Sequence, residues 1–259
     1  MSKFGLVFKH YFIRLMKDKI ALGIQLGIPI FIILFMVGMP DEDPFLGEAW
    51  AMIASTFVIS FATFGGQWAM GHIFDDLKEV RKWRLLATPV DKSVFQKAAM
   101  LASMTISFIN SMIVILVTTI MRPVEWGNLP LLIGIVILIN LLSHSFCYFI
   151  TVVMKDYKGA NAVTNFILMG LAILGGGIVV GLPDIVNIDA YTFIHDYTTP
   201  LSMGRQAILN GGIGGMFEGG AFVVRTTNWN IVMLNVGLLL GLTALFAVAS
   251  FVIGKVKKS

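Results

Sequence analysis

The sequence predicts an all-α integral membrane protein with six transmembrane helices, and its composition and charge-free runs support this fold class. Of the 259 residues, 57% are hydrophobic and only 13% are charged, with a mean hydropathy of +0.84. A soluble domain carries about 25% charged residues. A spanning helix needs about 20 residues. Runs without Asp, Glu, Lys or Arg reach that length at Ile20–Pro40, Ala49–Phe74, Ala98–Met121, Trp126–Met154, Gly159–Pro183 and Thr226–Gly254.

The topology of these spans follows from the distribution of basic residues. We place the spans near residues 20–39, 49–72, 98–121, 130–154, 160–182 and 230–254, in one transmembrane domain covering 1–259. One side then holds most of the 19 basic residues, and the other holds only Arg122, Arg205 and Arg225. Because basic loops stay in the cytoplasm, we expect a multi-pass protein of the cell (inner or plasma) membrane with both termini inside.

The N-terminal segment, residues 1–19, has the pattern of a basic amphipathic helix. One helical face carries Phe4, Val7, Phe8, Tyr11, Phe12 and Leu15, and the other carries Lys3, Lys9, His10, Arg14 and Lys17. Such helices lie along a membrane surface rather than across it. The first span that follows contains Pro29, which predicts a distortion within it.

A charged segment, His72–Lys97, separates the second and third apolar runs. It carries Lys78, Arg81, Lys82, Arg84, Lys92 and Lys97, and its residues 73–97 fall on the predicted cytosolic side. Asp75 and Asp76 suit the start of a helix, since acidic residues favour helix N-termini. Thr88-Pro89 predicts the N-cap and first residue of a second helix. The segment is the most prominent surface on which a cytosolic protein could bind.

A long segment before the last span, residues 183–229, is predicted to be external. Thr199-Pro200 has the pattern of an N-cap and first helical residue, and Asn210-Gly211 that of a C-cap. We therefore expect a short external or re-entrant helix over Pro200–Leu209. Gly211–Gly220 is expected to form a hairpin or loop.

Several chemistries find no support in the sequence. No Walker-type nucleotide motif occurs, no His, Cys, Asp or Glu cluster has metal-ligand spacing, and Cys147 is the single cysteine. We expect no bound cofactor or metal, no catalytic residues and no nucleic-acid partner. No carboxylate lies mid-span, which disfavours an ion-coupled carrier. The polar mid-span residues either form interhelical hydrogen bonds or line a pathway; they are Gln25, Gln67, Asn110, Asn140, Asn161 and Asn165.

Three Gly-x-x-x-Gly pairs occur in the predicted spans, at Gly23/Gly27, Gly177/Gly181 and Gly237/Gly241. Such pairs allow helices to approach closely. They fit packing within the chain or a self-association face, and the sequence does not choose between these.

The layout resembles the membrane (permease) subunit of an ABC-2-type ATP-binding cassette exporter. The resemblance covers nearly the whole chain and includes Leu85-Leu86-Ala87-Thr88-Pro89-Val90 after span two. A weaker match lies before span six, in Thr199-Pro200-Leu201 and Arg205-Gln206-Ala207. The family's Gly-Thr-x-Glu element before the Leu-Leu pair is missing, since this chain reads Val80-Arg81-Lys82-Trp83 there.

This resemblance implies two membrane subunits, as homodimer or heterodimer, and two copies of a separate cytosolic ATPase that binds ATP and Mg. It implies a coupling helix within the charged segment. Our proposed ATPase contacts are Asp75, Asp76, Leu77, Lys78, Val80, Arg81, Trp83, Arg84, Leu85, Leu86, Thr88 and Pro89. We expect spans one, two and five to line the route, with Gln25, Gln67 and Asn165 as pathway residues. The segment 183–229 would be the outer gate, with Thr199, Pro200 and Arg205 in it.

The predicted function is ATP-driven export of a hydrophobic or amphiphilic cargo, such as a drug, an antimicrobial peptide or a lipid-linked molecule. Efflux that confers multidrug or antibiotic resistance is one form of this. The chain itself would be a transporter subunit rather than an enzyme. One alternative is a membrane-embedded immunity or scaffold protein that binds a partner without transport. A secondary carrier or intramembrane enzyme is disfavoured by the missing buried carboxylates.

Overall fold

The protein is a helical bundle with one small β-hairpin. The computed structural model describes residues 2–37, 44–78, 82–83, 87–121, 126, 128–174, 199–211, 215–218, 221–224 and 228–256. The elements of the first half are α1 (Lys3–Lys17), α2 (Lys19–Leu22), the π-helical turn η1 (Gly23–Gly27), α3 (Ile28–Val37), α4 (Pro44–Phe64) and α5 (Gly66–Leu77). Those of the second half are α7 (Lys92–Met121), α8 (Leu129–Val153), α9 (Tyr157–Leu174), α12 (Pro200–Asn210), β1 (Gly215–Glu218), β2 (Ala221–Val224) and α13 (Trp229–Val256).

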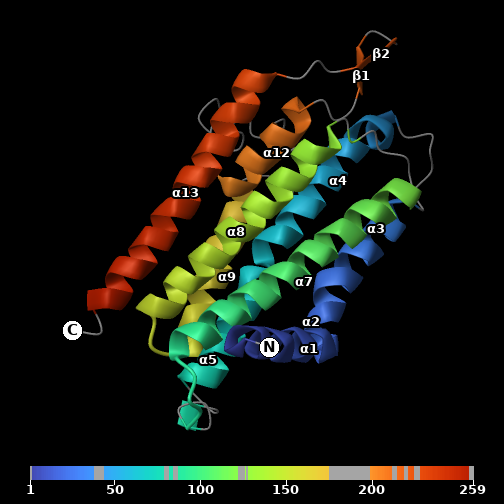
Figure 1. Cartoon of the computed structure of the whole chain (residues 1–259). Coiled ribbons are helices and arrows are strands. Elements are labelled where there is room, and N and C mark those ends of the chain that lie inside the picture. Colours follow the sequence, from blue (N-terminus) through green and yellow to red (C-terminus); the bar gives the residue numbers. More distant parts are fainter. Residues whose placement is uncertain are drawn as a thin grey trace.

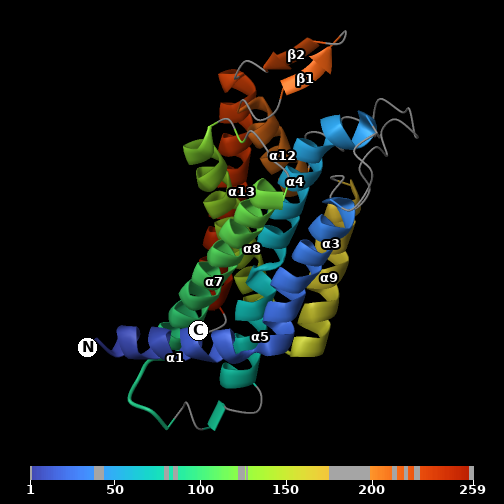
Figure 2. The ribbon, with the colours of Figure 1, turned by 90° about the vertical axis from the view of Figure 1, so that its right-hand side faces the viewer.

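The long helices run roughly side by side, and α1 lies across one end of them (Figures 1 and 2). We refer to this as the α1 end of the bundle. The antiparallel hairpin of β1 and β2 lies at the opposite end. Strand β1 falls within Gly211–Gly220, where a hairpin or loop was predicted, and β2 follows that range. Both termini lie toward the α1 end in Figure 1. This arrangement agrees with a topology in which the two termini share one side.

Each of the six predicted spans coincides with helix in the described residues, although α9 is described only to Leu174. Three helices, α7, α8 and α13, are each long and apolar enough to cross a membrane. A fourth candidate is the chain from α1 into α2–α3, which bends by 67° after Lys17. The chain is thus a multi-pass helical membrane protein, and the full set of six spans stays a prediction.

The predicted distortion of the first span takes the form of a π-helical turn immediately before Pro29. A proline has no N–H to donate, so the carbonyl of Gln25 lacks its usual helical partner four residues on. The wider turn Gly23–Gly27 occurs at this point. It includes Gln25, which is one of the predicted pathway residues.

The prediction that a helix begins at Thr88-Pro89 is wrong. Residues 87–90 form a turn and bend, and α7 begins at Lys92 and continues unbroken to Met121. The carbonyl of Asp91 accepts a hydrogen bond from the amide of Val94 at 2.9 Å. Asp is a better N-cap residue than Thr. The stronger N-cap residue, Asp91, therefore lies three residues beyond Thr88, which was predicted as the N-cap.

The same kind of signal correctly predicted α12. The side chains of Thr199 and Ser202 form a reciprocal capping box, and the amide of Gly211 donates to the carbonyl of Ile208 at the other end. The helix was predicted to be either external or re-entrant. It is inserted into the bundle, since most of α12 is buried against α4, α8 and α13. A Cβ added to Gly204 would lie 2.3 Å from Cδ1 of Ile139.

Span two is divided into α4 and α5 at Gly65, and the break is stabilised by neighbouring helices. The hydroxyl of Ser103 in α7 donates to the carbonyl of Gly65 at 3.1 Å. The amide of Gly66 donates to the hydroxyl of Ser143 in α8 at 3.0 Å. Backbone groups freed within a membrane need such partners. A Cβ on Gly66 would lie 2.5 Å from the Ser143 carbonyl oxygen, so α5 starts in tight contact with α8.

Candidate functional site

The base of α5 is joined to α1 by an ion pair whose carboxylate is buried and whose guanidinium is partly buried. Nη1 of Arg14 donates to both carboxylate oxygens of Asp76, at 2.9 and 2.7 Å, and the hydroxyl of Tyr11 donates to the same carboxylate at 2.7 Å. Nη2 of Arg14 reaches Asp75 at 3.4 Å. Only 3% of Asp76 is exposed. We call Tyr11, Arg14 and Asp76 the α1–α5 clamp.

Asp75 and Asp76, which were both predicted to contact the ATPase, have different surroundings in the structure. Asp76 is turned into the protein against α1 rather than toward a partner, while Asp75 is partly exposed beside it. The sequence placed Arg14 and Tyr11 on the amphipathic helix but did not indicate their partner. The only signal was the presence of unlike charges in two segments expected on the same side of the membrane.

The apolar face of α1 packs on α7 next to the clamp, a protein contact that the membrane-surface prediction did not include. Tyr11 and Leu15 are buried in a cluster with Phe95, Ala98 and Ala102. Because α1 contacts both α5 and α7, it ties the start of span three to the end of span two.

Lys78 fixes the end of α5 to the end of α8. Its ammonium donates to the backbone carbonyls of Thr151 and Met154, the latter at 2.7 Å, and lies 4.4 Å from the centre of the Phe74 ring. A cation at a helix C-terminus is favoured by the free carbonyls and by the helix dipole. This predicted contact residue thus stabilises the bundle through its own side chain.

Beyond Lys78 the described chain is exposed. Trp83 is 76% exposed, the Lys82 ammonium lies 5.4 Å from its ring centre, and Ala87, Thr88 and Pro89 are also exposed. This stretch projects past α1 at the α1 end of the bundle (Figure 2). The predicted contacts Val80, Arg81, Arg84, Leu85 and Leu86 lie outside the described residues, and Leu77 is half-buried beside α1 and α7.

The three predicted pathway residues line one cavity of about 610 Å³. Nε2 of Gln67 donates to Oδ1 of Asn165 at 2.9 Å, and Oε1 of Gln25 accepts from Asn110 at 3.0 Å. The remaining wall is mainly apolar and aromatic, with one carboxylate; it consists of Asp18, Ile20, Ala21, Ile24, Phe61, Phe64 and Trp68. These residues come from the predicted spans one, two and five and from the junction of α1 and α2. We call this space the amide cavity.

The predicted gate residues occupy the interior of the bundle. Thr199 and Arg205 are each 2% exposed, and Thr199 serves as the N-cap of α12. Pro200 lines a small apolar cavity of about 230 Å³ together with residues of α4, α8, α9 and α13. Pro200 therefore lies near the middle of α8 and α13, and a gating role for these residues stays a prediction.

No group of three or more His, Cys, Asp or Glu side chains close enough to hold a metal ion occurs in the part of the chain that the structure describes. The thiol of Cys147 is buried in the packing between α8 and its neighbours.

Comparison with known families supports the resemblance seen in the sequence. Residues 2–209, which run from α1 through nearly all of α12, match the family of ABC-2 type transporters. A comparison with curated proteins gave no match. The matched region is a membrane domain without an ATPase domain, and such permeases generally pair with separate ATPase subunits. The chain therefore belongs to the ABC-2 type transporter family.

Proposed function

We propose that this chain is the permease subunit of an ATP-driven exporter, and that its ATPase binds at the Lys78–Pro89 stretch. The observation that supports this most strongly is the exposure of Trp83 on a segment whose base is held on two sides. An exposed tryptophan among charged residues is a common anchor at protein interfaces. Lys82 beside it supplies a charge at the rim.

The contacts at the base of α5 favour transmission of a push into the bundle. The clamp holds α5 to α1, and Lys78 holds it to α8. A load applied to the base of α5 would thereby reach α1 and α8 as well. The break at Gly65, packed on α7 and α8, is the point at which α5 could pivot relative to α4.

The amide cavity is our proposed part of the cargo route. Its aromatic and aliphatic wall suits an apolar body, and the amides of Gln67 and Asn165 offer both donors and acceptors to a polar group. This chemistry fits a hydrophobic or amphiphilic cargo. The buried α12, with Thr199, Pro200 and Arg205, would close the route at the far end.

A second membrane subunit is part of the proposal. A Cβ placed on Gly23, Gly27, Gly237 or Gly241 would meet nothing within 4 Å, so these glycines do not serve close packing inside the described part of the chain. The faces of η1 and α13 that they occupy are open to lipid or to another chain. We propose a dimer, with the end that carries α1 and both termini in the cytoplasm.

Isolation of the tagged chain from native membranes in mild detergent tests the proposal. We expect an ATP-binding cassette ATPase to co-purify in equal stoichiometry, because the chain depends on it for energy. A sample from the same membranes carrying an unrelated tagged membrane protein controls for non-specific capture. If no ATPase co-purifies while the chain alone retains its activity, the permease assignment is wrong and the immunity or scaffold reading gains support.

A further inference from the structure

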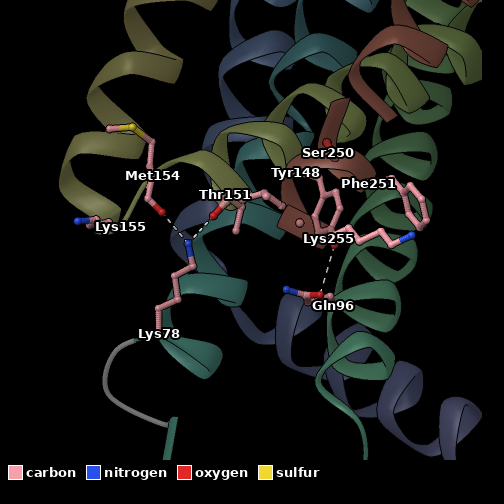
Figure 3. Close-up of a pocket in the computed structure, with 11 residues that line it drawn as sticks. Lys78, Gln96, Tyr148, Thr151, Met154, Lys155, Ser250, Phe251 and Lys255 are labelled. Carbon is pink, nitrogen blue, oxygen red and sulfur yellow. Dashed lines mark hydrogen bonds between the residues drawn. The ribbon is translucent and has the colours of Figure 1, made fainter. Parts of the chain in front are cut away.

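A second cavity, of about 850 Å³, opens at the α1 end between the ends of α5, α8 and α13 (Figure 3). Among the described residues that line it, three are lysines, Lys78, Lys155 and Lys255, and none is acidic. Gln96, Tyr148, Thr151 and Ser250 add polar groups, and Phe251 and Val152 add apolar wall. The cavity therefore combines positive charge with hydrogen-bonding groups.

An apolar cavity of about 460 Å³ adjoins it and shares Gln96, Tyr148 and Phe251 with it. Most of its wall comes from the membrane-facing parts of α7, α8 and α13, through Met100, Leu101, Met104, Leu141 and Ala247. The hydroxyl of Tyr148 donates to Oε1 of Gln96 at 3.3 Å where the two spaces meet. We refer to the two adjoining cavities together as the groove, which is basic at its α1 end and apolar along the bundle.

The charge at the basic end rests mainly on two exposed lysines. Lys155 and Lys255 are exposed and form no ion pair within the described ranges, and in Figure 3 they lie on either side of the cavity. Lys97 lies on the wall of the adjoining apolar part and is also exposed. Lys78 adds its charge at the floor while it donates to the α8 carbonyls.

We propose that this groove binds one anionic phospholipid of the inner leaflet. The phosphate would lie between Lys155 and Lys255, and an acyl chain would lie along Met100, Met104 and Ala247. Charge complementarity selects this occupant: a basic cavity at the predicted cytosolic boundary, beside an apolar cavity that shares its wall, suits an anionic headgroup with its hydrocarbon chain. A zwitterionic lipid would gain the apolar contact but little from the lysines.

The site is separate from the proposed cargo route. It shares no lining residue with the amide cavity, which lies on spans one, two and five rather than three, four and six. Lipid binding at this groove is therefore a property separate from transport, and it does not depend on which cargo the protein moves. A lipid seated there would contact Lys78, and so would lie directly beside the base of α5.

Native mass spectrometry of the full-length protein, titrated with phosphatidylglycerol or phosphatidylcholine, tests the proposal. We expect saturable binding of one phosphatidylglycerol per chain and much weaker binding of phosphatidylcholine. The Lys155→Gln/Lys255→Gln variant should bind phosphatidylglycerol about 30-fold more weakly, since each interfacial lysine contributes a factor of roughly five. Ala247→Phe should block the apolar part of the groove and weaken binding of the same lipid without changing any charge.

The matched control is Lys9→Gln/Lys17→Gln, which removes two exposed lysines from α1 at the same end of the bundle. It should bind phosphatidylglycerol nearly as the unaltered chain does. If both double variants weaken phosphatidylglycerol binding equally, the effect comes from the general positive charge of this end of the bundle, and the proposed site is wrong. Displacement of the lipid by glycerol phosphate alone would show a phosphate site without an acyl groove, which also contradicts the proposal. Loss of ATPase binding with lipid binding unchanged would assign the lysines to a protein interface instead.

Discussion

Replacement of Arg14 by leucine is expected to release α1 from α5 and to destabilise the α1 end of the bundle. Removal of one partner of a buried ion pair typically costs about 3 to 5 kcal/mol, because the other charge stays buried without it. Here the Asp76 carboxylate would lose two hydrogen bonds from the guanidinium and keep that from Tyr11. Amide exchange in α1, followed by hydrogen–deuterium exchange mass spectrometry, should accelerate by at least about 100-fold.

Two further variants make this prediction specific to the clamp. Lys17→Leu removes a positive charge from the exposed side of the same helix and should leave exchange in α1 nearly unchanged. Arg14→Leu combined with Asp76→Asn should be more stable than Arg14→Leu alone, since the second change removes the buried charge and keeps an acceptor for Tyr11. If the destabilisation of the double variant equals the sum of the destabilisations caused by the two single changes, the ion pair does not hold α1 in place.

Replacement of Trp83 by alanine is expected to uncouple the ATPase from the permease. Trp83 is 76% exposed, so its removal should leave the fold intact. A central tryptophan anchor contributes enough to an interface that its loss weakens binding by about 30-fold or more. ATPase association with the purified permease, measured by biolayer interferometry, should weaken to that extent, and cargo-stimulated ATP hydrolysis should fall with it.

Trp229→Ala is the matched control for this prediction. Trp229 is 49% exposed and begins α13, at the end of the bundle away from α1. Its replacement should leave ATPase association unchanged. Normal coupling in Trp83→Ala would remove this residue from the interface and with it the main support for the proposed docking stretch.

Predictions that depended on local chain chemistry were the most successful. The start and end of α12 follow from Thr199, Pro200 and Gly211, whose caps involve residues only three positions away. The N-terminal helix was predicted correctly from its helical apolar period, but its contact with α7 was not, because the pattern does not specify whether the apolar face meets lipid or protein. The start of α7 was predicted wrongly, because two capping residues, Thr88 and Asp91, compete within four positions and the sequence does not weigh their surroundings.

Contacts between distant segments were predicted less well. Arg14 and Asp76 are 62 positions apart, and nothing in either segment specifies that they meet. Lys78 was expected at a protein interface, whereas its ammonium caps the end of α8. By contrast, Gln25, Gln67 and Asn165, which were predicted as pathway residues, line one cavity, and their role in transport stays a prediction. Polar side chains in apolar spans must face other polar groups or a cavity, which leaves few arrangements.

Site-specific crosslinking tests the central claim, that a separate ATPase binds at the Lys78–Pro89 stretch, most directly. Ala87→Cys places a thiol at an exposed position in this stretch, and Asn230→Cys places one at an exposed position at the opposite end of the bundle. The native Cys147 is buried, so a maleimide reagent should not reach it. With a photoactivated crosslinker attached in native membranes, we expect an adduct with the ATPase from position 87 and none from position 230. An ATPase adduct from position 230 with none from position 87 would contradict the account.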